Sequence, residues 1–122
     1  MIGRQNQSAN ERNEMPNKTA GAFKATYAEL YDRHLVPLLF APYARILAQR
    51  AKALAPSNIL EIAAGTGVAT HQLVQLLPRT ARITATDVNQ PMIDQGMRKL
   101  WTRNVTWQQA DAMQLPFPDQ IF

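Results

Sequence analysis

The sequence predicts an α/β fold, an incomplete Rossmann-like doubly wound parallel sheet of about three strands preceded by N-terminal cap helices. From residue 58 onward, short runs rich in β-branched residues alternate with segments of helical periodicity. A glycine turn, Gly65-Thr66-Gly67, joins the first strand to the first of these helices. Repeated strand–helix units in this order imply parallel strands joined by right-handed crossovers.

We expect strands at 59–64, 82–87 and 104–109, each marked by Ile, Val, Thr or Trp. Helices are expected at 68–77, which Pro78 ends, and from about 89 to 100, where Asn89 suits the N-cap and Pro91 the first turn. The buried stripe of the second helix should be formed by Met92, Ile93, Gly96, Met97 and Leu100.

The N-terminal region should divide into a flexible tail at 1–20 and cap helices at 21–56, followed by the partial domain at 57–122. Helical order should begin near Ala22. We expect Pro37 and Pro42 to interrupt the helix, and a second helix to run from about 42 to 54. Its apolar face should comprise Tyr43, Ile46, Leu47, Ala51 and Leu54.

Composition narrows the class of protein. The 122 residues include no cysteine, which excludes disulfides and thiolate metal sites, and the apolar runs are too short for a membrane span. With no apolar signal core, the chain is expected to be cytoplasmic, without a membrane partner. Basic residues exceed acidic ones by four but are scattered, so nucleic acid is not favoured as a partner. The isolated His34 and His71 give no metal site.

The glycine turn carries the most information about a ligand. Such a turn lets backbone N–H groups approach a bound molecule, although many Rossmann-like folds share it. A dinucleotide fingerprint would have a third glycine where this chain has Thr70. Glu61, on the strand before the turn, would repel a pyrophosphate and favour a cationic ligand. S-adenosylmethionine, with its ammonium and sulfonium, matches that charge; the alternative is that Glu61 is simply a solvated strand end.

Two further acids follow the next strands. Asp87 ends the second strand and could accept both hydroxyls of a ribose, as NAD would also require, or could simply form a turn. Asp111 follows the third strand and could accept a hydrogen bond from an adenine amino group, while the Ala112 N–H could reach a ring nitrogen. The three acids together favour an adenosine-containing ligand.

These residues resemble a known family. Glu61-Ile-Ala-Ala-Gly-Thr-Gly67, Asp87 and Ala110-Asp111-Ala-Met-Gln-Leu-Pro-Phe-Pro-Asp119 look like class I S-adenosylmethionine-dependent methyltransferases, in particular the ubiquinone/menaquinone-biosynthesis type of small-molecule methyltransferase. The resemblance covers 58–122, and 27–51 looks like the family's cap helices.

The resemblance implies a cofactor site for S-adenosylmethionine, with S-adenosylhomocysteine as product. The implied residues are Glu61, Gly65 and Gly67 around the methionine part, Asp87 at the ribose, and Asp111 and Ala112 at the adenine. Ala63, Thr66 and Val88 complete the implied cofactor-binding set. Tyr27 and Tyr31 could lie over the cofactor, although their helical spacing favours core packing. Ala63 departs from the glycine that many members have, which is tolerable if its backbone keeps an ordinary β conformation.

The family's motif continues into a fourth strand, where this chain ends. In a doubly wound sheet that strand lies beside the first, at the ligand crevice. We therefore expect the acceptor-binding half to be missing, turnover to be weak or absent, and a homo-oligomer or a complementing chain to cover the edge of the first strand. The acceptor should be a small molecule. The alternatives are an inactive cofactor-binding or partner-regulating module and a nucleotide-dependent oxidoreductase, which Glu61 and Thr70 disfavour.

Overall fold

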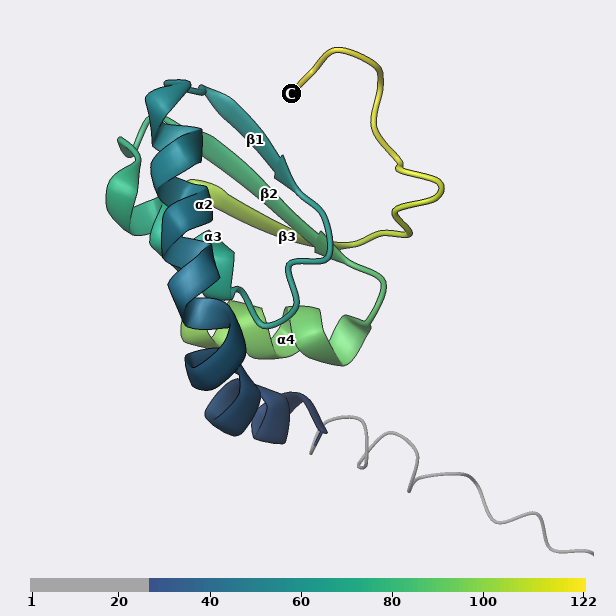
Figure 1. The fold of residues 1–122 in the computed structure, drawn as a ribbon. Coiled ribbons are helices and arrows are strands. Elements are labelled where there is room, and N and C mark those ends of the chain that lie inside the picture. Colours follow the sequence, from purple (N-terminus) through teal and green to yellow (C-terminus); the bar gives the residue numbers. More distant parts are fainter. Residues whose placement is uncertain (1–26) are drawn as a thin grey trace, which may run out of the picture.

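The computed structural model describes residues 27–122, coloured by sequence in Figure 1. Residues 1–26, which include the predicted tail and the expected helix start near Ala22, lie outside the described residues. The elements follow in the order η1 (Tyr31–Phe40), α2 (Ala41–Ala53), β1 (Asn58–Glu61), α3 (Val68–Leu76), β2 (Arg82–Asp87), α4 (Gln90–Lys99) and β3 (Val105–Gln109).

A three-stranded parallel sheet in the order β1-β2-β3 confirms the predicted fold class. Asn58 pairs with Arg82 and Glu61 with Ala85, while Asp87 pairs with Gln109. β1 is shorter than predicted because the chain leaves the sheet after Glu61 to form the glycine loop. β1 is also an edge strand of this sheet, as expected.

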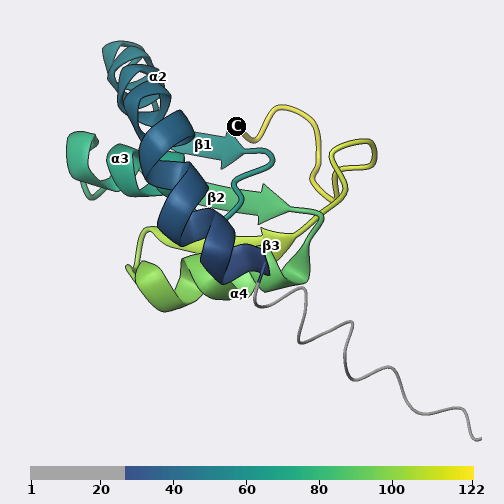
Figure 2. The same cartoon turned by 60° about the horizontal axis from the view of Figure 1, so that its bottom comes forward.

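The helices pack on one face of the sheet, while the residues after β3 run along the other side (Figures 1 and 2). The main core joins α2, α3 and β2 through Ala48, Leu73, Leu77, Ala81 and Ile83, all buried. Ile59 and Val105 extend this core onto β1 and β3. In α4, Met92, Ile93 and Gly96 are buried as predicted. The sequence period therefore identified the sheet-facing side of α4 correctly.

The predicted interruption at Pro37 is wrong. Residues 27–30 are α-helical, and the helix continues through η1, which is wound as a π-helix, directly into α2. The Ala41 N–H donates to the Val36 carbonyl, five residues earlier. Proline lacks a donor and crowds the carbonyl four residues before it in an α-helix, so the wider π winding accommodates Pro37 without ending the helix. Pro42 lies in the first turn of α2, where proline is tolerated.

The predicted apolar face of α2 is also wrong in most of its members. Ala44 and Ala48 are the buried residues of α2, and Ala51 packs at the core margin. The four larger residues of the predicted face, Tyr43, Ile46, Leu47 and Leu54, are exposed. Small side chains allow α2 to approach α3 closely, so alanine rather than bulk marks the packed face.

The ends of the other helices differ slightly from expectation. α3 ends one residue early, at Leu76, and Asn89 precedes α4 without a side-chain capping hydrogen bond. Instead, Asn89 accepts backbone hydrogen bonds from Met92 and Ile93. Across residues 27–122, no helix has both the length and the apolar character needed to cross a membrane.

Candidate cofactor-binding site

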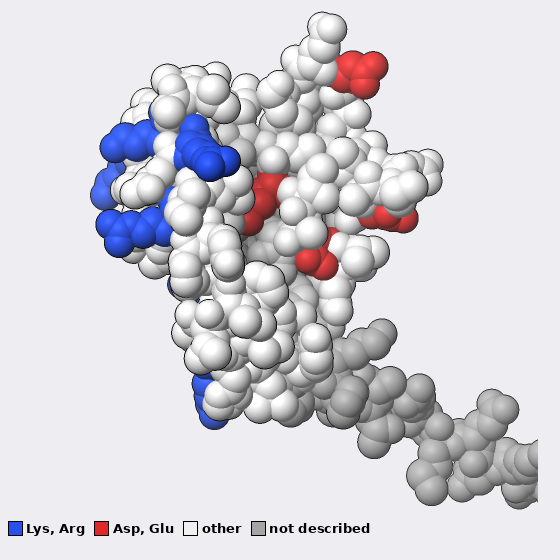
Figure 3. All heavy atoms as spheres, viewed as in Figure 1, with Lys and Arg blue, Asp and Glu red and all other residues white. Residues whose placement is uncertain are grey.

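The three predicted acids lie at the carboxyl ends of adjacent parallel strands. Glu61 ends β1, Asp87 ends β2, and Asp111 follows β3 by two residues. In the view of Figure 3, most Lys and Arg side chains gather where the strands begin, whereas Asp and Glu lie toward the strand ends and the C-terminal segment. The carboxyl edge of the sheet therefore has an electrostatic character suited to a cation.

A small hollow of about 150 Å³ lies at this edge. It is lined by Ile62, Ala63, Asp87, Val88, Ala110, Asp111 and Ala112. The structure thus brings together five of the predicted site residues, from three different loops. The remaining four, Glu61, Gly65, Thr66 and Gly67, belong to the strand end and turn next to it. Apolar side chains beside two carboxylates form a slot suited to a flat ring with polar edges.

The glycine loop has a backbone that requires its two glycines. Gly65 and Gly67 have φ values of +58° and +88°, in the left-handed region. A Cβ added to Gly67 would lie 2.4 Å from Cη2 of Trp107. The half-buried Trp107 also packs against Gly96, and its indole N–H donates to the Leu100 carbonyl at 3.2 Å. Gly67 therefore also makes room for Trp107, which packs between the glycine loop and α4.

The expectation that Ala63 keeps an ordinary β conformation is wrong. Its φ is +56°, which a side chain with a Cβ rarely adopts. The chain must reverse between Glu61 and Gly65, and the Ala64 N–H donates to the Thr86 carbonyl at 2.8 Å, which fixes the far side of that reversal. Ala63 is thus a strained position at the rim of the hollow.

Glu61 is held by Thr70, the residue that replaces the third glycine of a dinucleotide fingerprint. The fully buried Thr70 hydroxyl donates to Glu61 Oε2 at 2.6 Å. Burial raises the pKa of Glu61 from its ordinary 4.5 to about 7, against the lowering effect of the hydrogen bonds from Thr70. A neighbouring cation would restore the charged form. Glu61 is therefore a partly buried, hydrogen-bonded acid and not a solvated strand end.

Asp87 ties two loops together. Its Oδ2 accepts from the Gly65 N–H at 2.9 Å, and its Oδ1 accepts from the Asn89 N–H at 2.9 Å. Each carboxylate oxygen can accept a second hydrogen bond, so both remain able to meet a hydroxyl group. The turn-forming role and the binding role that the sequence left open are thus compatible.

Asp111 and Ala112 form an exposed tight turn after β3. Asp111 Oδ1 accepts from the Met113 N–H at 2.8 Å, and Asp111 forms an isolated bridge with Gln114. Gln109 Nε2 donates to the Val88 carbonyl at 2.8 Å and links this turn to the loop after β2. This hydrogen bond fixes the relative position of the two loops that line the hollow.

Tyr31 lies over the glycine loop. A Cβ added to Gly65 would be 3.9 Å from both Cε1 and the hydroxyl oxygen of Tyr31. Its ring also neighbours Tyr27 and Phe40, with centroids 6.4 and 5.6 Å away. Burial raises the pKa of Tyr31, and nearby Tyr27, Asp87 and Asp32 raise it further. Tyr31 is partly buried, whereas Tyr27 is exposed, so the structure separates two residues that the sequence treated alike.

Sequence reasoning missed Asp32. Its carboxylate accepts hydrogen bonds from Thr66 of the glycine loop, at 2.7 Å, and from Lys99 of α4. These partners are 34 and 67 residues away, so no local pattern could reveal them. Metal chemistry has no comparable support: within residues 27–122, no three His, Cys, Asp or Glu side chains converge on one point.

Comparison with known proteins now bears on this geometry. Residues 59–122 match a family model described as a methyltransferase domain, which spans more than half of the chain. The chain belongs to this methyltransferase family. The resemblance drawn from Glu61-Ile-Ala-Ala-Gly-Thr-Gly67 and the strand-end acids is thereby confirmed for this part of the chain, as a class I S-adenosylmethionine-dependent methyltransferase.

Curated relatives cover a similar region. The chain is 40% identical over 70 residues to the ubiquinone/menaquinone biosynthesis C-methyltransferase UbiE of Pseudomonas aeruginosa, over 54% of this chain and 27% of the relative. It is 33% identical over 69 residues to UbiE of Francisella tularensis, over 53% and 28%. The chain therefore spans little more than a quarter of the length of these relatives.

Solved structures support the same assignment. DhpI in complex with SAH is similar with 29% identity and a TM-score of 0.55, over 73% of this chain and 42% of that one. A TehB-like SAM-dependent methyltransferase from Corynebacterium glutamicum shares the fold, with 19% identity and a TM-score of 0.52, over 75% and 46%. The structural likeness thus covers a larger share of the chain than the family model does.

Proposed function

We propose that this chain supplies the S-adenosylmethionine-binding part of a methyltransferase that acts on a small-molecule acceptor. The observation that carries the proposal is that Glu61, Asp87 and Asp111 lie at the carboxyl ends of adjacent strands, with Asp87 bonded to the glycine loop and both Asp87 and Asp111 lining the adjoining hollow. The activity of a full-length protein is itself part of the proposal, because the match covers only a fraction of the relatives.

The residues present fit this cofactor. Glu61 would face its ammonium group, with the hydroxyl of Thr70 fixing the carboxylate. Asp87 would accept the ribose hydroxyls while its bond to Gly65 holds the loop. The apolar slot beside Val88 and Ala112 would hold the adenine. Asp111 would accept a hydrogen bond from the adenine amino group.

When bound, the cofactor supplies a methyl group made electrophilic by the sulfonium. The chain contributes orientation and exclusion of water: Glu61 and Asp111 would anchor the two ends of the ligand and Asp87 its ribose, while Tyr31 lies over the glycine loop. Holding reactants in an aligned geometry can supply up to about 7–11 kcal/mol of barrier lowering. Within this proposal, the residues that would align the acceptor belong to the parts of the family that this chain does not match.

A second copy or a complementing chain is proposed to cover the edge of β1. Its support is the position of β1 as an edge strand, with Asn58 Nδ2 donating to the Ile121 carbonyl at 3.3 Å as a partial cover. Sedimentation at micromolar concentration should show self-association. A monodisperse monomer that also fails to bind a chain carrying the rest of the fold would refute this proposal. We also propose a cytoplasmic location for the protein.

Calorimetry with S-adenosylmethionine, S-adenosylhomocysteine and NAD tests the cofactor assignment. We expect S-adenosylhomocysteine to bind, Asp87→Ala to weaken it at least tenfold, and Asp94→Ala, an exposed acid of α4 that bonds Gln90, to leave it unchanged. NAD binding in preference to both would sink the assignment. A labelled-methyl transfer assay, with and without a chain carrying the rest of the fold, separates an enzyme from an inactive binding module.

A further inference from the structure

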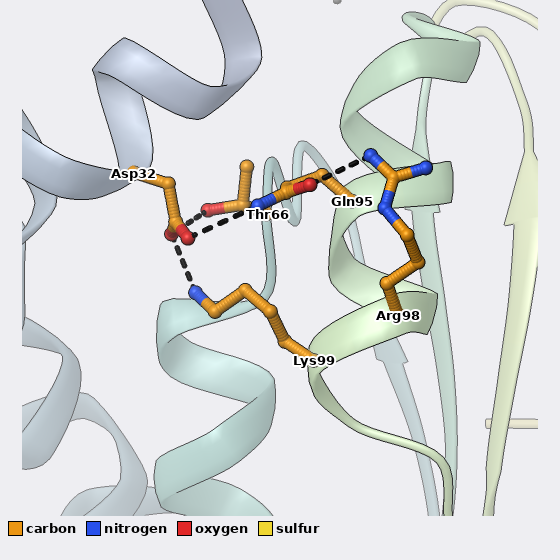
Figure 4. Close-up of polar contacts among 5 residues, drawn as sticks. All are labelled: Asp32, Thr66, Gln95, Arg98 and Lys99. Carbon is orange, nitrogen blue, oxygen red and sulfur yellow. Dashed lines mark hydrogen bonds and ion pairs between the residues drawn. The ribbon is translucent and has the colours of Figure 1, made fainter.

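The carboxylate of Asp32 joins three elements that are distant in the sequence. Asp32 lies in the first turn of η1, Thr66 in the glycine loop, and Lys99 at the end of α4. Thr66 Oγ1 donates to Asp32 Oδ1 at 2.7 Å, Lys99 Nζ pairs with the same oxygen, and Gln95 Nε2 makes a longer contact of 3.5 Å with Oδ2. Figure 4 shows the three donors converging on this one side chain.

Thr66 is the residue of the glycine loop that is best placed to bond a residue of another element. It is only 3% exposed and lies between Gly65 and Gly67, both with positive φ. Glycines give the loop its shape but make it costly to order, since they lose the most conformational freedom on folding. Thr66 is the residue of the Gly65-Thr66-Gly67 turn that has a polar side chain, so its hydrogen bond to Asp32 restrains the conformation of the turn.

Asp32 is preceded by Tyr31, whose ring lies over Gly65. Two consecutive residues of η1 thus contact two consecutive residues of the loop, Tyr31 by its ring and Asp32 by its carboxylate. The contact of Asp32 with the loop fixes the rotation and height of η1 above it. That rotation in turn decides where the ring of Tyr31 stands.

We propose that Asp32 is a positioning residue for the cofactor site: it clamps the cap helix to the glycine loop and α4, and thereby holds the ring of Tyr31 beside Gly65. The inference rests on the proposed cofactor function. Asp32 acts through Thr66 and Tyr31, because its carboxylate bonds Thr66 and Lys99 and the residue does not line the hollow.

Lys99 neutralises the clamp. Its side chain is 41% exposed, against 14% for that of Asp32, so water can compete for the ammonium but hardly for the carboxylate. Lys99 therefore compensates the buried charge, while Thr66 gives the contact its direction. Loss of the Lys99 charge should weaken the contact between Asp32 and the glycine loop, and loss of the Asp32 carboxylate should abolish it.

The test compares Asp32→Asn, Lys99→Met and the conservative Lys99→Arg with two controls. Asp94→Asn alters an acid of α4 that bonds Gln90, and Lys52→Met removes an exposed lysine of α2. Stopped-flow measurement of S-adenosylhomocysteine should show dissociation about tenfold faster for Asp32→Asn, with a smaller change in association. Lys99→Met should lie between this variant and the wild type, and Lys99→Arg should restore slow dissociation.

Amide hydrogen exchange on the ligand-free chain gives an independent readout. Residues 65–67 should exchange about tenfold faster in Asp32→Asn, while the strands keep wild-type protection. If residues 65–67 of Asp32→Asn exchanged at the wild-type rate, the proposal for Asp32 would be refuted. It would also be refuted if S-adenosylhomocysteine dissociated from Asp32→Asn no faster than from Asp94→Asn. If Asp32→Asn does not fold, Thr66→Val and Lys99→Met carry both measurements. If the wild type does not bind S-adenosylhomocysteine at all, the proposed function fails, and the exchange experiment still decides the clamp.

Discussion

Thr70 donates a 2.6 Å hydrogen bond to Glu61, the partly buried acid at the end of β1. The hydroxyl group satisfies one carboxylate oxygen and favours the charged form, whereas burial opposes it. The position that would be glycine in a dinucleotide fingerprint is thus used here to orient an acid. Four predictions follow from this site and its surroundings.

Replacing Thr70 by valine should weaken S-adenosylhomocysteine binding about tenfold at pH 7. Valine matches the shape of threonine but removes the hydrogen bond that favours ionised Glu61, so the carboxyl group stays neutral to a higher pH. Calorimetry across pH 6–9 should show the affinity loss shrinking as pH rises. Thr70→Ser, which keeps the hydroxyl, is the control, and equal losses in both variants would show that the methyl group matters instead.

Cofactor affinity should increase with pH as Glu61 ionises, since the proposed partner is an ammonium group. With a pKa of about 7, Glu61 is largely neutral at pH 6 and largely charged at pH 8. Calorimetry in buffers of different ionisation enthalpy should detect proton release on binding near pH 7, absent in Glu61→Gln. Affinity independent of pH in the wild type would contradict the role given to Glu61.

The stability of the ligand-free chain should change with pH in the opposite direction. The folded-state pKa of Glu61 is raised above its ordinary 4.5, so the folded state binds the proton more tightly than the unfolded chain. The free energy of unfolding should therefore fall as pH rises from 4.5 to about 7, by up to about 3 kcal/mol from this group. Urea titrations of the wild type and Glu61→Gln should differ in slope over this window, and parallel profiles would refute the assignment.

Two backbone positions near the site should both be more stable with glycine than with alanine. Ala63→Gly should stabilise the chain by about 1 kcal/mol, because glycine adopts a φ of +56° without steric cost. Gly96→Ala should destabilise it by about 1–3 kcal/mol, although alanine is the better helix former, because the new Cβ would lie 2.6 Å from Trp107. Thermal unfolding measures both. In a Trp107→Leu background, Gly96→Ala should cost less stability than it does in the wild type. An equal cost in both backgrounds would show that Trp107 is not the source of the clash.

Much of the fold could be predicted because it depends on local patterns. The alternation in β2 and the apolar stripe of α4 report which side faces the core, and the parallel crossovers then bring the ends of the strands together. That is why Asp87, Val88, Asp111 and Ala112 could be assigned to one edge before any contact was known. The packed face of α2 was misjudged because side-chain size, rather than closeness of approach, was taken as the sign of burial.

By itself, the sequence determined the order of strands and helices, the glycine loop and the three acids at the carboxyl edge, because these follow from residue periodicity and from the direction of parallel strands. Only the tertiary structure decided that Thr70 orients Glu61, that Ala63 is strained and that Asp32 reaches Thr66 and Lys99. Except for the local strain at Ala63, these relationships join residues on separate elements. Their distances depend on how helices and sheet pack, which no spacing along the chain encodes.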